Sequence, residues 1–144
     1  MTDLRPPVPA RHAMRWRIAI LLCLVTAIRY VDRQALSVAA PVVREEFNLT
    51  NTQYGWIAYA FLMAYALGQV ALGPLIDRLG TRRSFTLAVV WWSVAAMLHA
   101  LGRGFVSFFA LRALLGVTEA VNFPAALKAV AEWFPKHERS LATG

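Results

Sequence analysis

Four apolar stretches, each long enough to cross a lipid bilayer, constrain this chain more than any other feature. The apolar core of a bilayer is about 30 Å thick, and a helix of about 20 residues spans it. Residues 54–76 contain no charge over 23 positions, and residues 84–101 contain no Asp, Glu, Lys or Arg over 18. Residues 16–40 and 105–127 are of comparable length but carry charged side chains. The sequence therefore predicts an all-α membrane protein with four transmembrane helices.

Composition supports this class and argues against a soluble domain, a nucleic-acid-binding protein and an enzyme. Hydrophobic residues make up 58% of the chain, against about 45–50% in soluble domains. The net charge of +7 comes from short basic clusters between apolar stretches, which is not the continuous basic face that nucleic-acid binding needs. No CxxC, HExxH or GxxxxGK[ST] motif occurs, so we expect no metal, no cofactor and no enzyme chemistry.

Local signals fix several helix ends. Thr50 and Gln53 have the spacing of a capping box, so we expect the second helix to begin there. Pro135 should end the extension of the fourth helix near Phe134. Small residues recur every four positions on the second helix and predict close packing against a neighbouring helix. These are Ala60, Ala64 and Gly68.

The distribution of basic residues predicts the orientation. Ten of them fall in the N-terminal tail, the second link and the final stretch, and only two, Arg44 and Arg103, fall on the other side. By the positive-inside rule both ends are expected in the cytoplasm. The expected division is a cytoplasmic tail at 1–15, a four-helix transmembrane portion at 16–127, and a cytoplasmic link with the start of a fifth helix at 128–144. The ten are Arg5, Arg11, Arg15, Arg17, Arg78, Arg82, Arg83, Lys128, Lys136 and Arg139.

A cleavable signal peptide is an alternative interpretation of the first apolar stretch. Basic residues, an apolar run and small residues at 25–27 have that form. Three further apolar stretches and the loss of the basic tail on cleavage argue against it.

Five charged side chains lie in the interior of the first and fourth stretches, away from their ends. A charge at the bilayer centre costs about 2.5–3.5 kcal/mol on insertion scales, so these groups should face protein or water. At 100° per residue, Arg29, Asp32 and Arg33 share an arc of about 100°, whereas Arg112 and Glu119 lie within about 20° of each other. Each helix therefore presents one polar face, and the two faces are predicted to form a shared polar seam.

The depth of these groups suggests a specific pairing. Asp32 lies about 22 Å from the cytoplasmic end of its helix, and Arg112 about 10 Å from the outer end of its own. Both fall in nearly the same layer of the membrane. We therefore hypothesise that Asp32 pairs with Arg112. The alternative is an ion-pair network that only fixes helix packing, although buried ion pairs are poor stabilisers.

The chemistry of this seam suits the movement of an anion together with a proton. A guanidinium binds a carboxylate through two parallel hydrogen bonds and does not deprotonate. Desolvation raises the pKa of a buried carboxylate, and a nearby Arg lowers it. The charge of such a carboxylate can therefore change near neutral pH, as proton coupling requires.

Three motifs resemble those of a known family. Residues 73–83 fit G-x-L-x-D-R-x-G-x-R-R and resemble the signature loop of the major facilitator superfamily. Residues 30–41, together with 112–124 and 133–139, resemble the anion:cation symporter branch of that family. This branch takes up sugar acids such as hexuronates, aldonates and glucarate, and it includes vesicular organic-anion carriers. The resemblance covers nearly everything after residue 15.

The resemblance implies a role for each residue of the seam. Arg33 would bind the substrate carboxylate. Asp32 and Glu119 would be the proton-coupling carboxylates, with Arg112 as their ionic partner. Tyr65 and Tyr30 would line the sugar site.

Arg29 departs from the branch, which more often has Asn just before the Tyr. An additional cation there would favour a dianionic substrate or alter the coupling.

A conformational latch is implied at the cytoplasmic end of the second helix. It would hold one state of alternating access, with its partner in a part of the transporter beyond residue 144. The resemblance assigns Gly73, Asp77, Arg78, Gly80, Arg82 and Arg83 to it.

As a whole, the resemblance implies a proton-coupled symporter of small organic anions in the cytoplasmic membrane of a bacterium. Its fold would have about twelve spans in two six-helix halves. The chain carries four of these spans and stops at Gly144, so we expect an N-terminal fragment that needs the missing C-terminal half for a complete pathway. Its partners would be the substrate, protons and the lipid bilayer.

Two other functions remain open at this stage. The chain could be a truncated membrane fragment that does not transport, or part of a proton-driven exporter of the same superfamily.

Overall fold

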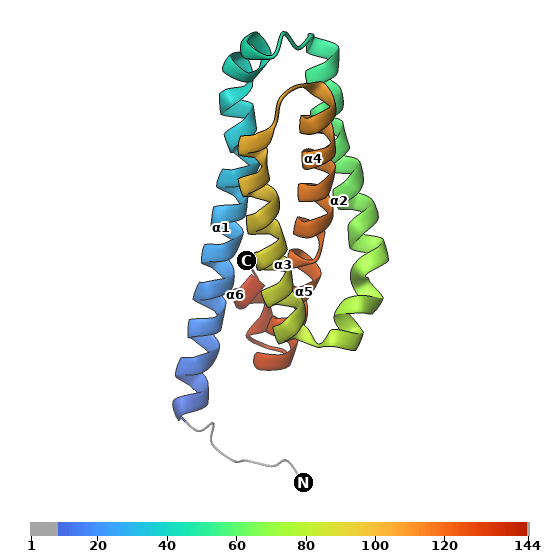
Figure 1. Cartoon of the computed structure of the whole chain (residues 1–144). Helices are drawn as coiled ribbons and strands as arrows, with labels where there is room; N and C mark the ends of the chain where they lie inside the picture. Colours follow the sequence, from blue (N-terminus) through green and yellow to red (C-terminus); the bar gives the residue numbers. More distant parts are fainter. Residues whose placement is uncertain (1–8, 144) are drawn as a thin grey trace.

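The computed structural model describes residues 9–143, and every regular element in that range is a helix (Figure 1). This confirms the all-α prediction. The elements are α1 (Pro9–Glu46), α2 (Asn51–Leu79), α3 (Thr81–Leu98), the short 3-10 helix η1 (His99–Leu101), α4 (Phe105–Ala120), α5 (Asn122–Trp133) and α6 (Arg139–Thr143).

Three helical segments are long and apolar enough to cross a membrane. They are α2, α3 with η1 (Thr81–Leu101), and α4 with α5 (Phe105–Trp133). α1 has 38 residues, a length of about 57 Å at 1.5 Å per residue, which exceeds the bilayer core. Its mid-helix charges set it apart from the three apolar segments. Residues 1–8 of the expected cytoplasmic tail lie outside the described residues, and α1 already begins at Pro9.

The predicted helix ends are confirmed. Thr50 Oγ1 accepts from the Gln53 amide at 3.2 Å, and the Gln53 side chain accepts from the Thr50 amide at 2.9 Å. This reciprocal capping box starts α2. At the other end of the chain, α5 stops at Trp133 with Phe134 in an extended conformation, directly before Pro135.

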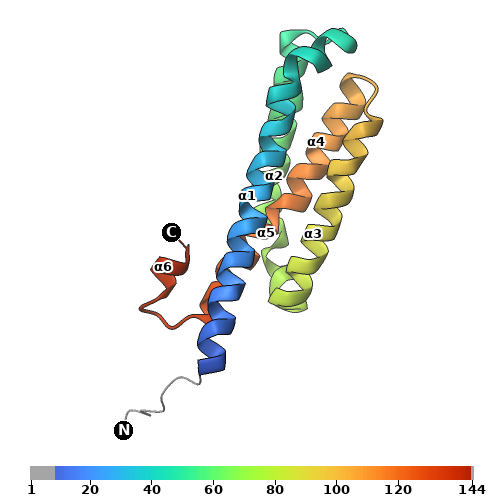
Figure 2. The same cartoon turned by 90° about the vertical axis from the view of Figure 1, so that its left-hand side faces the viewer.

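The fourth apolar stretch is interrupted at Val121, between α4 and α5. Pro124 explains the position, because a proline lacks an amide donor and its ring clashes with the carbonyl four residues earlier, here that of Ala120. Val121 keeps helical dihedral angles, with φ −69° and ψ −29°. The chain therefore continues in the same general direction, and α5 extends the span to Trp133 (Figure 2).

Small residues allow α2 and α4 to pack closely, as the sequence predicts. A Cβ atom added at Gly116 would lie 2.5 Å from the Phe61 carbonyl oxygen and 3.1 Å from Ala64 Cβ. One added at Gly68 would lie 2.7 Å from Ala120 Cβ. Backbones that approach this closely hold α4 in a fixed register along α2.

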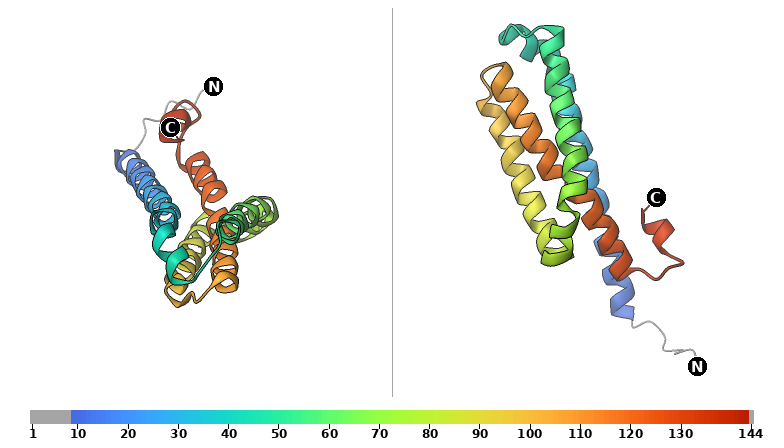
Figure 3. Two further views of the ribbon diagram at one scale, coloured as in Figure 1. Left: turned by 90° about the horizontal axis from the view of Figure 1, so that it is seen from above. Right: turned by 90° about the vertical axis from the view of Figure 1, so that its right-hand side faces the viewer.

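The chain's basic clusters meet at one end of the bundle. The start of α1, the turn from α2 to α3 and the link after α5 lie together at that end (Figure 1). Viewed along the bundle, α1 and α2 lie on opposite sides of the α4–α5 segment (Figure 3). This arrangement directs the charged faces of α1 and α4 toward each other.

Candidate functional site

Arg33 connects three helices. Its guanidinium carbon lies 4.6 Å from the ring centroid of Phe61 and 5.0 Å from that of Tyr65, both on α2. The two rings are stacked, with centroids 5.9 Å apart and planes 13° apart. Arg33 Nη2 lies 3.6 Å from Glu119 Oε2 on α4. The Arg33 guanidinium therefore lies against two aromatic rings and beside one carboxylate.

Glu119 is the most deeply buried charge of the site. Its side chain has no exposed surface, whereas that of Arg33 is 29% exposed. Within the described part of the chain, neither Glu119 oxygen has a hydrogen-bond partner. A buried carboxylate with one long ion pair is poorly compensated for its lost hydration. The Arg33–Glu119 contact is therefore a single long ion pair that leaves both Glu119 oxygens without a hydrogen bond among the described residues.

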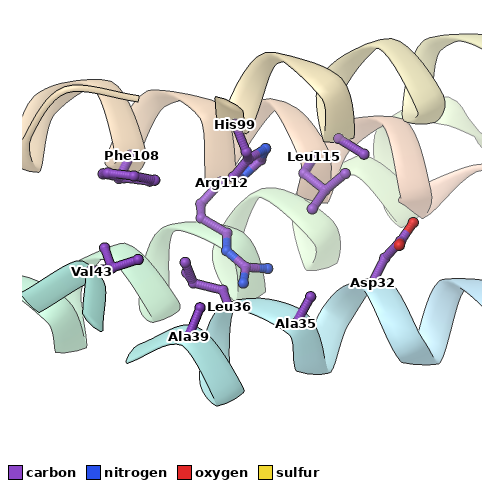
Figure 4. Close-up of a pocket in the computed structure, with 10 residues that line it drawn as sticks. Asp32, Ala35, Leu36, Ala39, Val43, His99, Phe108, Arg112 and Leu115 are labelled. Atoms are coloured by element: carbon purple, nitrogen blue, oxygen red, sulfur yellow. The ribbon is translucent and has the colours of Figure 1, made fainter. Parts of the chain in front are cut away.

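The predicted pairing of Asp32 with Arg112 is wrong. Both residues line a cavity of about 290 Å³ between α1, α3 and α4, yet they lie at separate places along it (Figure 4). The ion pair that forms uses Arg33 and Glu119 instead. The prediction used the depth and the shared arc of these residues, but neither determines which of two neighbouring side chains, 100° apart on α1, reaches α4. The long Arg33 side chain crosses to α4, and the short Asp32 side chain does not.

Tyr30 lies apart from the Arg33 cluster, and Arg29 forms no ion pair with a carboxylate among residues 9–143. Arg29 is 5% exposed, and its Nη1 atom has no hydrogen-bond partner among residues 9–143. The Tyr30 ring is 5.5 Å from the Arg29 guanidinium and lines a different cavity, of about 380 Å³, beside α5 and α6. Of the two tyrosines predicted to line a sugar site, only Tyr65 is therefore placed against Arg33.

Asp77, a residue of the expected latch, has an ion-pair partner within this chain. Asp77 Oδ1 accepts from Lys128 Nζ at 2.7 Å, which joins the end of α2 to α5. One turn further along α5, Glu132 Oε1 accepts from the Thr81 hydroxyl at 2.7 Å. These two contacts clamp α5 to the α2–α3 turn, whereas the expected latch partner beyond residue 144 lies outside this chain and stays a prediction.

The other latch residues shape the turn or face outward. Gly80 has φ +77°, a left-handed conformation that glycine adopts without steric cost. Gly73 has open space around the position of a Cβ atom. Three arginines are exposed, and none is ion-paired with a carboxylate in the described range. They are Arg78, Arg82 and Arg83.

Sequence reasoning missed three contributors to this region. Phe61 lies four residues before Tyr65, and that spacing on one helix face was an available signal. Lys128 is 51 residues from Asp77, and no local pattern links the two. His99 follows the last turn of α3, and only the fold brings it into the cavity of Arg112.

Comparisons with known proteins agree with the motifs. The D-galactonate transporter of Escherichia coli O6:H1 is 37% identical over 130 residues, which cover 90% of this chain and 30% of that protein. The hexuronate transporter of Escherichia coli K12 is 37% identical over 131 residues, 91% of this chain and 30% of the relative. A probable galactarate/D-glucarate transporter of Bacillus subtilis is 36% identical over 143 residues, 95% and 31% respectively.

The chain spans about a third of the length of these relatives, which are transporters and not enzymes by name. The sequence profile of the Major Facilitator Superfamily matches residues 22–144. That match includes the Arg33–Glu119 pair and the Asp77 clamp. The family thus accounts for most of the chain, the apolar helices and the motif between α2 and α3, and this membrane protein belongs to the Major Facilitator Superfamily.

Proposed function

We propose that this chain is part of a proton-coupled carrier that takes sugar acids across the bacterial cytoplasmic membrane by alternating access. One observation supports the proposal: an ion pair between Arg33 and the buried Glu119 joins α1 to α4 and lies against two aromatic rings. The names of the relatives supply the class of substrate.

Substrate binding begins at Arg33. A substrate carboxylate competes with Glu119 for the guanidinium and forms two parallel hydrogen bonds, which the present 3.6 Å contact does not. The Phe61 and Tyr65 rings hold the guanidinium plane in place during this exchange.

Proton coupling follows from the same exchange. Once Arg33 turns to the substrate, an ionised Glu119 would be left buried without a partner, which is strongly unfavourable. Glu119 therefore takes up a proton as the substrate binds, and the substrate and the proton enter the cell together. Asp32, which faces the cavity of Arg112, is the second proton-coupling carboxylate.

The charge of the site suits acids with one or two carboxylates. Three guanidinium groups lie near two carboxylates, so the site carries one net positive charge when both carboxylates are ionised. A proton on Glu119 raises this to two. Arg29 supplies the additional cation, and we propose that it favours dianions such as glucarate. The basic end of the bundle, which includes the N-terminus, faces the cytoplasm. The pathway is completed by the remaining spans of the two-halved fold.

The test is uptake by cells that lack their own sugar-acid carriers and express the gene encoding this chain. Labelled D-galactonate and D-glucarate are supplied with the outside medium acidic or at the internal pH. We expect the cells to take up at least one of the two sugar acids. That uptake should be faster when the outside medium is acidic. Arg33→Lys should raise KM by roughly tenfold, since an ammonium does not offer the paired donors of a guanidinium. Arg29→Asn should shift preference from glucarate toward galactonate.

Arg103→Lys is the matched control, because Arg103 is exposed in the link between η1 and α4. Uptake that ignores the proton gradient would refute coupling. Equal KM values for the Arg33 variant and the control would refute the carboxylate-binding role.

A further inference from the structure

The cavity of about 290 Å³ that contains Arg112 extends along α1 away from the Arg33–Glu119 pair. Its volume is at the low end of the range for small-molecule pockets. The lining is mostly apolar, with three polar side chains: Asp32 at one end, Arg112, and His99 on η1 (Figure 4).

A hydrogen bond to the backbone determines which nitrogen of the neutral His99 imidazole carries the proton. His99 Nδ1 lies 2.8 Å from the Ala95 carbonyl oxygen. Because a carbonyl oxygen only accepts, Nδ1 must carry the proton of this hydrogen bond. In the neutral ring the second nitrogen, Nε2, is then an acceptor. His99 Nε2 is buried and has no partner among the described residues.

Arg112 provides the complementary group. The residue is 5% exposed, and its buried Nε atom has no hydrogen-bond partner in the described range. Its guanidinium points into the cavity (Figure 4), and all its polar atoms are donors. One unsatisfied donor and one unsatisfied acceptor therefore line the same small space. Such groups in a buried position are costly unless something satisfies them.

A hydroxyl group satisfies both, and a carboxylate does not. A hydroxyl donates one hydrogen bond and accepts others, whereas an ionised carboxylate only accepts. A carboxylate here would meet the lone pair of His99 Nε2 and the like charge of Asp32. The chemistry of the cavity is thus complementary to the hydroxylated part of a ligand, and that of Arg33 to its acidic end.

We propose that this cavity is a hydroxyl-binding subsite in which His99 Nε2 accepts from a substrate hydroxyl and Arg112 donates to its oxygen or to that of the adjacent hydroxyl. The inference rests on the proposed function, because it places the polyhydroxy chain of the transported acid here. The cavity ends at Asp32, which adjoins Arg33 in the chain. His99 would then distinguish sugar acids from organic acids that lack hydroxyl groups.

The experiment compares D-galactonate with its mono-deoxy analogues as competitors of labelled D-galactonate uptake in the same cells. The unmodified protein should prefer D-galactonate over at least one analogue by roughly tenfold or more. His99→Leu and His99→Phe remove the acceptor and should abolish most of that preference. His99→Gln keeps an acceptor near the position of Nε2 and should retain it. Met97→Leu is the matched control, because Met97 is 66% exposed and does not line the cavity.

A second measurement does not depend on the folding of a His99 variant. In a Cys23→Ser background, Ala39→Cys places a thiol in the cavity lining. Saturating D-galactonate should slow the alkylation of this thiol by a maleimide, and the discriminated deoxy analogue should slow it less.

The outcomes separate this inference from the proposed function. Absence of sugar-acid uptake by the unmodified protein would refute the proposed function. Normal uptake with an unchanged hydroxyl preference in the Leu and Phe variants would overturn the subsite. So would D-galactonate that competes for uptake yet leaves the thiol introduced by Ala39→Cys fully reactive; the cavity would then hold water only.

Discussion

Neighbouring residues on α1 face different parts of the bundle, and this gives them different partners. Arg33 reaches α2 and α4, whereas Asp32 lines the cavity shared with Arg112. Side-chain length reinforces the difference, since only the arginine crosses the space between the helices. The site therefore has one ion pair and, beside it, a mostly apolar cavity whose lining residues Asp32 and Arg112 are not ion-paired with each other.

Glu119→Gln tests whether the ion pair couples protons to transport. A glutamine keeps the size of the side chain but neither carries a charge nor takes up a proton. We expect net uptake that no longer responds to an inward proton gradient, while exchange of internal for external substrate persists. Transport assays at several external pH values, with exchange measured in parallel, check this.

Glu46→Gln serves as the control for that experiment, because Glu46 is exposed at the end of α1. If Asp32→Asn and Glu119→Gln both leave every transport property unchanged, the ion pair only fixes helix packing.

At the scale of the helices, the closest approach is between α2 and α4. Gly116 sits directly against the backbone of α2 at Phe61 and Tyr65. These are the two residues whose rings hold Arg33. Glu119 lies three residues after Gly116 on α4. The packing of α4 against α2 therefore sets the distance between Glu119 and the rings of Phe61 and Tyr65.

Gly116→Ala should disturb both stability and substrate binding. The added Cβ would lie 2.5 Å from a backbone oxygen and 3.0 Å from a backbone nitrogen, and overpacking of this kind costs about 1–3 kcal/mol. We expect a lower free energy of unfolding, measured by thermal unfolding in detergent. Gly55→Ala on α2 is the matched control, because nothing lies within 4 Å of its added Cβ. It should stabilise the protein by about 0.5–1 kcal/mol. Equal stability of the two variants would contradict the close approach.

Much of the fold could be predicted because its signals are local. The capping box at Thr50, the stop before Pro135 and the small residues facing α4 all act within one or two turns. The Arg33–Glu119 pair could not be predicted from periodicity, because rotation between helices is set by packing. For the same reason the Asp77–Lys128 contact, 51 residues apart, has no sequence signal.

At the scale of the whole chain, the basic end of the bundle is held together by contacts between distant segments. Arg15 Nη1 lies 3.3 Å from Glu138 Oε2, which ties the start of α1 to the link after α5. The Trp16 and Phe134 rings meet edge to face at 5.6 Å. Together with the Asp77–Lys128 pair, these contacts join the start of α1, α5 and the α2–α3 turn at this end of the bundle.

The Asp77–Lys128 pair is the part of this clamp that we expect to control alternating access. Asp77→Asn or Lys128→Gln would leave one charge unpaired and release α5 from α2. If the clamp stabilises the state open to the outside, its loss should shift the population toward the inward-open state. The cavity lined by Arg112 and Ala39 would then be reached less often from outside. With Ala39→Cys in the Cys23→Ser background, we expect a membrane-impermeant maleimide to alkylate the introduced thiol several-fold more slowly.

The exchanged pair Asp77→Lys with Lys128→Asp should restore the rate, because the two charges attract in either order. Lys136→Gln is the control, since Lys136 is exposed and forms no ion pair with a carboxylate in the described range. An alkylation rate that stays the same in both single variants would show that the pair does not bias the two states.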